Sequence, residues 1–472
     1  MTESTPLHGQ SVTALADAIR RGTLRARDVL ELHLERIARL DGPIGAFVFQ
    51  DAAGARAAAD AIDARVARGE DPGPLAGVPF GVKELEDVAA WTHPRGARVF
   101  ADRIAATTST HVTRLRRAGA IPLGLTASPE MGAASFTASL LHGVTRNPWN
   151  PARTPGGSSG GSAAAVTLGL VPFATGSDSG GSLRIPAAFT GLVGFKGTYG
   201  RVPRGPGYVG MPNVRNYGVL TRTVRDTARI LDCVVGADEH DPLSLPHPGY
   251  AFAERIATYD LRGTRTAWTT DLGFGVCEPE VARVVRAAAD RLVAGAELAA
   301  TDVAITLADP EESWRILMTP DLLDAYAPFI PAREDEVNPM LRFLYASADS
   351  IGAREIGRAA LVRDGVVQSL AAIFAQVDLL LMPTTPIPAF AAEGPPPGTI
   401  DGRAVGPIAS VAQTYVFNLS GHPAISVPAG MVDGTPVGLQ IVGRRHEDDR
   451  VLAAAARFEA LQPWPLLAPA AG

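Results

Sequence analysis

Two clusters of glycine and serine lie close together in the first half of the chain. GGSSG spans 156–160 and GSDSGGS spans 176–182. Glycine lets backbone N–H groups approach a ligand closely, and a serine hydroxyl can act as a nucleophile or carry a proton. Between the clusters, SAAAVTLGL favours a helix and VPFAT favours a strand, which a flexible linker would not need. The two clusters therefore indicate a chemical site.

The second cluster could hold a nucleophilic serine beside a site for negative charge. Successive small residues can turn several N–H groups toward one point, which stabilises an oxyanion. Ser182, the last residue of the cluster, would then attack a carbonyl, but a serine needs a base. An alternative nucleophile is Ser158, because GGSSG fits the GxSxG pattern of α/β-hydrolases, and His422 with an aspartate would complete that site.

Lysine is almost absent from this chain. Of 43 basic residues, only Lys83 and Lys196 are lysine, and the others are arginine. An arginine keeps its proton in a protein, whereas burial can drive a lysine to the neutral amine, which acts as a base. Each lysine could equally serve in packing, so composition alone leaves its role open.

Composition excludes several classes of protein. The 472 residues are 46% hydrophobic and 19% charged, which is typical of a globular protein, and a net charge of −6 gives no sign of nucleic-acid binding. The two cysteines, Cys233 and Cys277, are too few for a disulfide framework. The nine histidines lack metal-ligand spacing, so we expect no metal and no cofactor. With no candidate membrane span and no targeting pattern, we expect a cytoplasmic protein.

Helix and strand patterns alternate along most of the chain. Strands are expected at 75–83, 121–126 and 265–270, and helices at 110–118, 224–235 and 278–293. This alternation predicts an α/β fold, with a mixed, mostly parallel, twisted central sheet covered by helices on both faces. We expect one large domain over 1–472, with N-terminal helices in 10–68, a core at 75–235 and a mostly helical insertion at about 310–375.

The glycine-serine segment and its surroundings resemble the amidase signature family of hydrolases. GGSSGGSAAAV and GSDSGGSLRIPAAFTGLVGFKGTYG are similar to the family's signature. Further blocks match at 77–84, 143–157, 218–226 and 418–443, in the family's order, with about 242–380 the least matched. The resemblance implies the amidase signature fold and a Ser–cis-Ser–Lys triad.

The triad residues carry over onto this sequence one by one. Ser182 matches the nucleophile that forms an acyl-enzyme, Ser158 matches the bridging serine with a cis peptide bond, and Lys83 matches the base. In this scheme neutral Lys83 takes a proton from Ser158, which takes one from Ser182. Lys196 is interpreted as structural.

Nearby groups receive supporting roles from the same resemblance. The backbone N–H groups expected to hold the oxyanion are those of Ser179, Gly180 and Gly181. Asp178 and Arg184 are expected to support the nucleophile loop.

Substrate contacts are less well defined. The loop 204–218 is either a lid or an ordinary surface loop, and its candidate substrate-contacting residues are Tyr208, Met211, Arg215 and Tyr217. The aromatic residues from Trp314 to Tyr345 fit either an apolar pocket or plain core packing.

The resemblance predicts a hydrolase that cleaves amide C–N bonds in small apolar or aryl amides. Carbamate (urethane) or ester hydrolysis with the same triad is one alternative. Another class of function is the glutamine-hydrolysing subunit of a tRNA-dependent amidotransferase, which works inside a complex. Apart from that case, we expect a small-molecule substrate and a monomer or homodimer.

Overall fold

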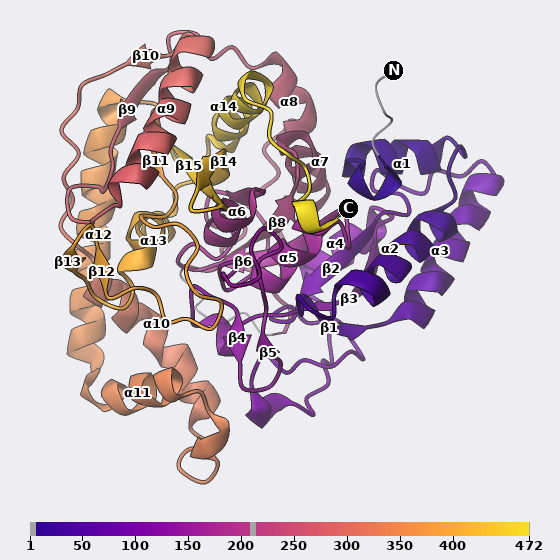
Figure 1. The fold of residues 1–472 in the computed structure, drawn as a ribbon, viewed down its shortest axis with the longest axis horizontal. Helices are drawn as coiled ribbons and strands as arrows, with labels where there is room; N and C mark the ends of the chain where they lie inside the picture. The colour runs from indigo at the N-terminus through magenta and orange to yellow at the C-terminus, as the bar shows by residue number, and fades with distance from the viewer. Residues whose placement is uncertain (1–5, 208–213, 472) are drawn as a thin grey trace.

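An 11-stranded sheet crosses the centre of the molecule in the order β1-β3-β2-β6-β8-β7-β14-β15-β11-β9-β10 (Figure 1). The structure, a computed structural model, describes residues 6–207 and 214–471. The strands of the sheet are β1 (Phe47–Gln50), β2 (Pro79–Lys83), β3 (Ile121–Thr126), β6 (Phe173–Asp178), β7 (Val193–Lys196), β8 (Asn216–Thr221), β9 (Arg265–Trp268), β10 (Ala299–Ala300), β11 (Leu379–Pro383), β14 (Ala424–Val432) and β15 (Thr435–Gly443). Two small hairpins lie outside it, β4 (Ala138–Ser139) with β5 (Gly143–Val144) and β12 (Thr399–Ile400) with β13 (Arg403–Ala404).

Helices cover both faces of this sheet. They are α1 (Val12–Arg20), α2 (Ala26–Leu40), α3 (Ala52–Ala67), α4 (Thr110–Arg117), α5 (Gly160–Thr167), α6 (Arg184–Thr190), α7 (Val224–Val234), α8 (Phe252–Thr258), α9 (Pro279–Gly295), α10 (Glu311–Tyr326), α11 (Pro339–Ser347), α12 (Ala353–Gln376), α13 (Ala412–Leu419) and α14 (Asp448–Leu461). On β15, Gly438 abuts α6 and Gly443 abuts α14. Successive strand residues point to opposite faces, so this odd spacing places the two helices on opposite sides.

The direction of the strands differs in part from the expectation. The sheet is mixed, as predicted, but only the pairs β2–β3, β2–β6, β9–β11 and β9–β10 are parallel. The pairs from β6 through β8, β7, β14 and β15 to β11 are antiparallel, as is β1–β3. The expected predominance of parallel strands is therefore corrected. One reason is that β14 and β15 are joined directly by a hairpin turn. A hairpin makes two strands antiparallel, whereas parallel strands need a longer crossover connection.

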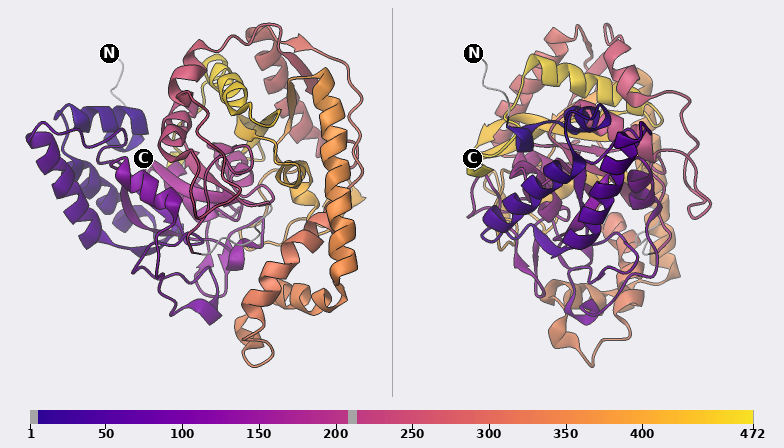
Figure 2. Two further views of the ribbon diagram at one scale, coloured as in Figure 1. Left: turned by 180° about the vertical axis from the view of Figure 1, so that it is seen from behind. Right: turned by 90° about the vertical axis from the view of Figure 1, so that its right-hand side faces the viewer.

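The N-terminal helices and the helical segment α10–α12 lie at opposite ends of the molecule (Figures 1 and 2). The predicted elements at 110–118, 121–126, 224–235 and 278–293 are present as α4, β3, α7 and α9. The strand predicted at 75–83 begins later, at Pro79. Among the described residues, no helix is long and apolar enough to cross a membrane.

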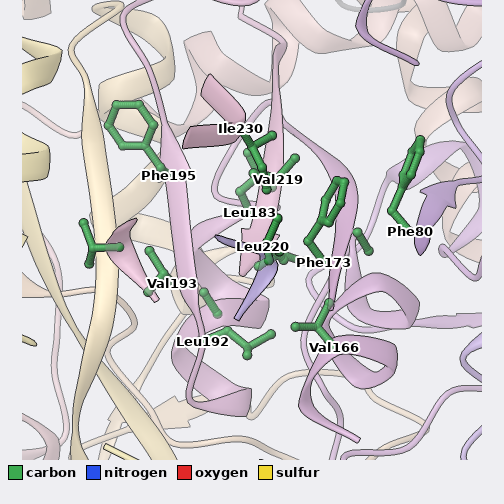
Figure 3. Close-up of a cluster of buried hydrophobic side chains, with 14 of the residues drawn as sticks. Phe80, Val166, Phe173, Leu183, Leu192, Val193, Phe195, Val219, Leu220 and Ile230 are labelled. Carbon is green, nitrogen blue, oxygen red and sulfur yellow. The ribbon is translucent and has the colours of Figure 1, made fainter. Parts of the chain in front are cut away.

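A buried apolar cluster holds the strands beneath the glycine-serine segment (Figure 3). Phe80 of β2 and Phe173 of β6 stack with their ring centroids 5.0 Å apart. Val166 of α5 and Leu183 join the same cluster, and both are fully buried. This packing fixes β2, α5 and β6 relative to one another, and the predicted triad residues lie at or close to the ends of these elements.

Candidate active site

The ends of two parallel strands bring Lys83 beside the second glycine-serine cluster. β2 and β6 are neighbours, with Phe80 opposite Phe173. Because the strands run in the same direction, the end of β2 at Lys83 lies at the same sheet edge as the end of β6. The backbone N–H of Lys83 donates to Thr175 Oγ1 at 3.0 Å, which fixes the register at this point.

The Lys83 amine is fully buried among three serine hydroxyls. Its Nζ lies 2.8 Å from Ser158 Oγ, 2.9 Å from Ser159 Oγ and 3.1 Å from Ser177 Oγ. Burial lowers the pKa of Lys83 well below its usual value, and the charge of Arg215 lowers it further. The site therefore favours the neutral amine, which has a free lone pair.

Ser158 lies two residues before α5, in a tightly packed turn. The peptide bond between Gly157 and Ser158 is cis, which is the bond that the resemblance implies to be cis. Gly157 has no room for a side chain, because a Cβ there would lie 2.7 Å from the carbonyl oxygen of Ala134. Gly156 has φ +86°, a backbone conformation that favours glycine.

Ser182 is half-buried on the turn that joins β6 to α6, and it lines a cavity of about 380 Å³. The side chain of Asp178 holds this turn through hydrogen bonds to its backbone. Its carboxylate accepts the N–H groups of Gly181 and Leu183 at 2.8 and 3.2 Å.

Asp178 and Arg184 form a fully buried ion pair with an N–O distance of 2.9 Å. Burial alone would raise the pKa of Asp178, but the charge and hydrogen bonds of Arg184 and a hydrogen bond from Asn418 hold it well below its usual range. Arg184 also donates to Gln440 Oε1 and to Asn418 Oδ1. The pair lies beneath the serine-bearing turn and ties it to the C-terminal half of the chain.

The backbone amides of the second cluster are not equivalent. The N–H of Gly181, expected to hold an oxyanion, already donates to Asp178 Oδ1 at 2.8 Å. Within the described residues, the N–H groups of Ser179 and Gly180 have no hydrogen-bond acceptor. Both residues line the cavity with Ser182. These two amides, rather than that of Gly181, are available to a ligand in the cavity.

The cavity is apolar on most of its surface. Its apolar walls come from α10, α11, α6 and neighbouring loops, and include Trp314, Met318, Leu322, Phe343, Leu344, Ile185, Ile408 and Val411. Glu311 and Arg315 are the charged side chains among its lining residues. Part of the aromatic series of the helical segment therefore faces the cavity, whereas Tyr326 is buried and donates to Glu130 Oε1 at 2.6 Å.

Of the four loop residues predicted to touch substrate, the two that the structure describes, Arg215 and Tyr217, are not among the residues that line the cavity. Tyr208 and Met211 lie outside the described residues. Tyr217 is 2% exposed on β8, where its ring stacks on His111 with centroids 5.9 Å apart. Arg215 is also buried, and its charge acts on Lys83.

The alternative site built on His422 is not assembled. His422 is buried, its Nδ1 lies 2.9 Å from Ser420 Oγ, and its ring stacks on Phe374 at 4.9 Å. Burial lowers its pKa to about 3, and the charge of Lys196 adds to this. Ser158 instead has the Lys83 amine as its partner.

Lys196 is the second fully buried lysine, and it bonds backbone oxygens. Its Nζ donates to the carbonyls of Gly197 and His422 at 3.0 and 2.5 Å. Burial lowers its pKa to about 7, and the charge of Arg184 contributes. These contacts agree with the structural role expected for it.

Ser159 and Ser177 are functional candidates that the sequence analysis missed. Thr175 and Ser177 lie two residues apart on β6 and therefore point to one face, where both contact Lys83. Two polar residues at this spacing in a buried strand were the sequence signal that could have identified Ser177.

Within the described residues, no cluster of three or more His, Cys, Asp or Glu side chains could hold a metal ion.

Comparisons with known proteins agree on one family. The family model described as Amidase matches residues 28–452. The acylamidase of Rhodococcus erythropolis is 36% identical and the match covers 98% of each chain. A glutamyl-tRNA(Gln) amidotransferase subunit of Salinispora arenicola is 34% identical, over 97% of this chain and 98% of that protein. The crystal structure of a bacterial aryl acylamidase of the amidase signature family superposes with a TM-score of 0.92, at 31% identity over 97% of each chain.

Proposed function

This chain belongs to the amidase signature family and hydrolyses amides, and we propose that it cleaves small apolar or aryl amides through an acyl-enzyme on Ser182. The observation that carries the proposal is the 2.8 Å contact between the buried Lys83 amine and Ser158 Oγ. A base, a bridging hydroxyl and a cavity-facing serine are the three parts that such an acyl transfer needs.

The hydrogen bonds around Lys83 suit a neutral amine. A neutral amine donates two hydrogen bonds and accepts one, so Nζ can donate to Ser159 and Ser177 while it accepts from Ser158. The Ser159 hydroxyl can direct its own proton to the carbonyl of Ser177, at 3.4 Å. Lys83 is then a base whose lone pair points to the bridging serine.

In the proposed reaction Ser182 Oγ attacks the amide carbonyl carbon as its proton passes to Ser158, whose own proton passes to Lys83. The N–H groups of Ser179 and Gly180 stabilise the oxyanion. Ser158 returns a proton to the departing amine nitrogen as the C–N bond breaks. Water then attacks the acyl-enzyme by the same proton route and releases the acid.

The cavity supports an apolar or aryl substrate. Trp314, Met318 and Phe343 line it together with Ser182. Apolar surface of this kind stabilises a bound hydrocarbon or ring by about 25 cal/mol per Å² buried. One of the similar structures is that of an aryl acylamidase, which supports an aryl amide as the substrate.

A second candidate function is glutamine hydrolysis within an amidotransferase complex. It is favoured by several relatives, glutamyl-tRNA(Gln) amidotransferase subunits that are 33–35% identical over at least 95% of this chain.

A carbamate or an ester would use the same serine attack, with an alcohol leaving from the ester. The apolar cavity wall is the reason to place anilides first.

The test is a substrate panel on the purified chain, with p-nitroacetanilide, phenylacetamide, p-nitrophenyl acetate, ethyl N-phenylcarbamate and glutamine. We expect anilide hydrolysis without any partner protein. Glutamine hydrolysis that requires added partner subunits, with no anilide turnover, would establish the second candidate instead.

Two variants test the proposed triad in the same assay. Lys83→Ala is expected to abolish measurable turnover, whereas His422→Ala is expected to retain it. Loss of activity in His422→Ala with full activity in Lys83→Ala would contradict the proposed mechanism.

A further inference from the structure

Two side chains from distant segments donate hydrogen bonds to Ser179 and Gly180, which we call the oxyanion loop. The carbonyl of Ser179 accepts a hydrogen bond from Trp314 Nε1 at 3.1 Å. The carbonyl of Gly180 accepts one from Thr414 Oγ1 at 2.5 Å. Trp314 belongs to α10, in the stretch that least resembles the family's motifs, and Thr414 belongs to α13. The carbonyls of Ser179 and Gly180 thus each accept a hydrogen bond from a distant segment.

The contact at the Ser179 carbonyl sets the direction of a backbone amide. In a trans peptide the C=O and the following N–H point in opposite directions. The Ser179 carbonyl points toward the indole, so the Gly180 N–H points away from it. The next amide, that of Gly181, is already bonded to Asp178. Trp314 therefore orients one of the two peptides whose N–H groups are available for an oxyanion.

The indole is itself held in place on its other sides. Its ring stacks on Tyr415 with centroids 5.4 Å apart and an interplanar angle of 28°. The hydroxyl of Tyr415 donates to Asp309 Oδ1 at 2.9 Å. The ring also lies against Gly180, where a Cβ would be 2.6 Å from Trp314 Cζ2. These contacts fix the position of the N–H donor.

From this geometry we infer that Trp314 is a positioning residue for the proposed reaction, which it serves by orienting the Ser179–Gly180 peptide for the oxyanion. The inference rests on the proposed function. Because Trp314 also lines the cavity beside Ser182, one side chain contacts the substrate space and holds the oxyanion loop. The helical segment thus contributes to the chemical step as well as to the shape of the cavity.

The test compares two half-buried tryptophans that make the same kind of bond. Trp314→Phe removes the indole N–H and keeps an aromatic ring. Trp464→Phe is the matched control, because Trp464 Nε1 donates to the carbonyl of Arg222 at 3.0 Å, away from the cavity lining. Should Trp314→Phe fail to fold, Trp314→Tyr, which also lacks an indole N–H, replaces it with the same expected outcomes.

We expect Trp314→Phe to lower kcat for p-nitroacetanilide about 10- to 100-fold, less than the loss of an oxyanion donor itself, with KM changed less than about threefold. Phenylboronic acid forms a charged tetrahedral adduct with a serine, so its inhibition constant should rise by a similar factor. Trp464→Phe should leave both values unchanged. Equal kcat and inhibition constants in Trp314→Phe and the parent would overturn the inference.

A fall of kcat in both tryptophan variants, together with a loss of thermal stability, would also overturn it, because the effect would then be one of general packing. Failure of the proposed function has a different signature. In that case the parent itself lacks amide hydrolysis, or Ser182→Ala keeps the parent's activity.

Discussion

Replacement of either lysine by methionine separates catalysis from packing, because both side chains are fully buried and methionine has a similar length. Lys83→Met removes the only proposed base for both acylation and deacylation. A positioned general base contributes about 10²- to 10⁴-fold, so kcat should fall by about the same factor, or about 3–5 kcal/mol in activation free energy. Lys196→Met, which loses contacts to two backbone carbonyls, should keep kcat within about threefold of the parent.

The same pair of variants predicts how stability depends on pH. Both lysines have folded pKa values below the ordinary value of 10.5, and that of Lys196 is about 7. Above the folded pKa and below 10.5, the unfolded chain binds a proton that the folded chain does not. The free energy of unfolding therefore rises with pH in that window, by about 1.4 kcal/mol per pH unit for each such lysine. As pH falls toward the folded pKa, this contribution is lost.

The assays are steady-state hydrolysis of p-nitroacetanilide and urea unfolding at pH 7, 8 and 9. Each methionine variant should show a smaller rise of unfolding free energy with pH than the parent, and only Lys83→Met should lose turnover. Turnover in Lys83→Met within tenfold of the parent would refute the assignment of the base. If the free energy of unfolding rose with pH as steeply in both variants as in the parent, the inference that both buried amines are neutral would be refuted.

Three further changes test the loop and the cavity. Asp178→Asn leaves the buried charge of Arg184 without its partner and should cost about 3–5 kcal/mol of unfolding free energy in urea, and a loss below 1 kcal/mol would contradict this role. Gly180→Ala places a Cβ 2.6 Å from Trp314 Cζ2, so kcat should fall at least about tenfold, and unimpaired turnover would show that the loop tolerates displacement. Phe343→Ala, at a side chain that is 71% exposed but lines the cavity, should raise KM for anilides about 2- to 10-fold with kcat kept, and an unchanged KM would remove α11 from substrate binding.

The local order of elements around the triad could be predicted from sequence. The helix and strand between the two glycine-serine clusters are present as α5 and β6, because small apolar residues at helical spacing and a short apolar run are strong local signals. The scarcity of lysine singled out Lys83 and Lys196 equally, and the resemblance to the amidase signature family then distinguished the base from the structural lysine. Strand direction could not be predicted in the same way, since it depends on which distant segments pair.

The lining of the cavity, and whether a given backbone N–H is already hydrogen-bonded, depend on contacts that the local sequence does not show. Trp314 lies 135 residues from its partner Ser179, and nothing in the local pattern of α10 distinguishes its indole from core packing. The Gly181 N–H belongs to a glycine-rich turn that could hold an anion, and only the position of the Asp178 carboxylate shows that it is occupied. Tyr217 has a residue type suited to substrate contact, but its strand directs it toward His111.

The burial of both lysines has a practical consequence for chemical labelling. Lys83 and Lys196 are the only lysines in the sequence, and both have 0% exposure. The lysine side chains of the folded protein therefore offer no accessible amine to succinimidyl esters or aldehydes. Acylation of either lysine would therefore report opening of the core, which mass spectrometry of these two positions would detect. Attachment to a support or a dye will need groups other than these two lysines, such as surface carboxylates.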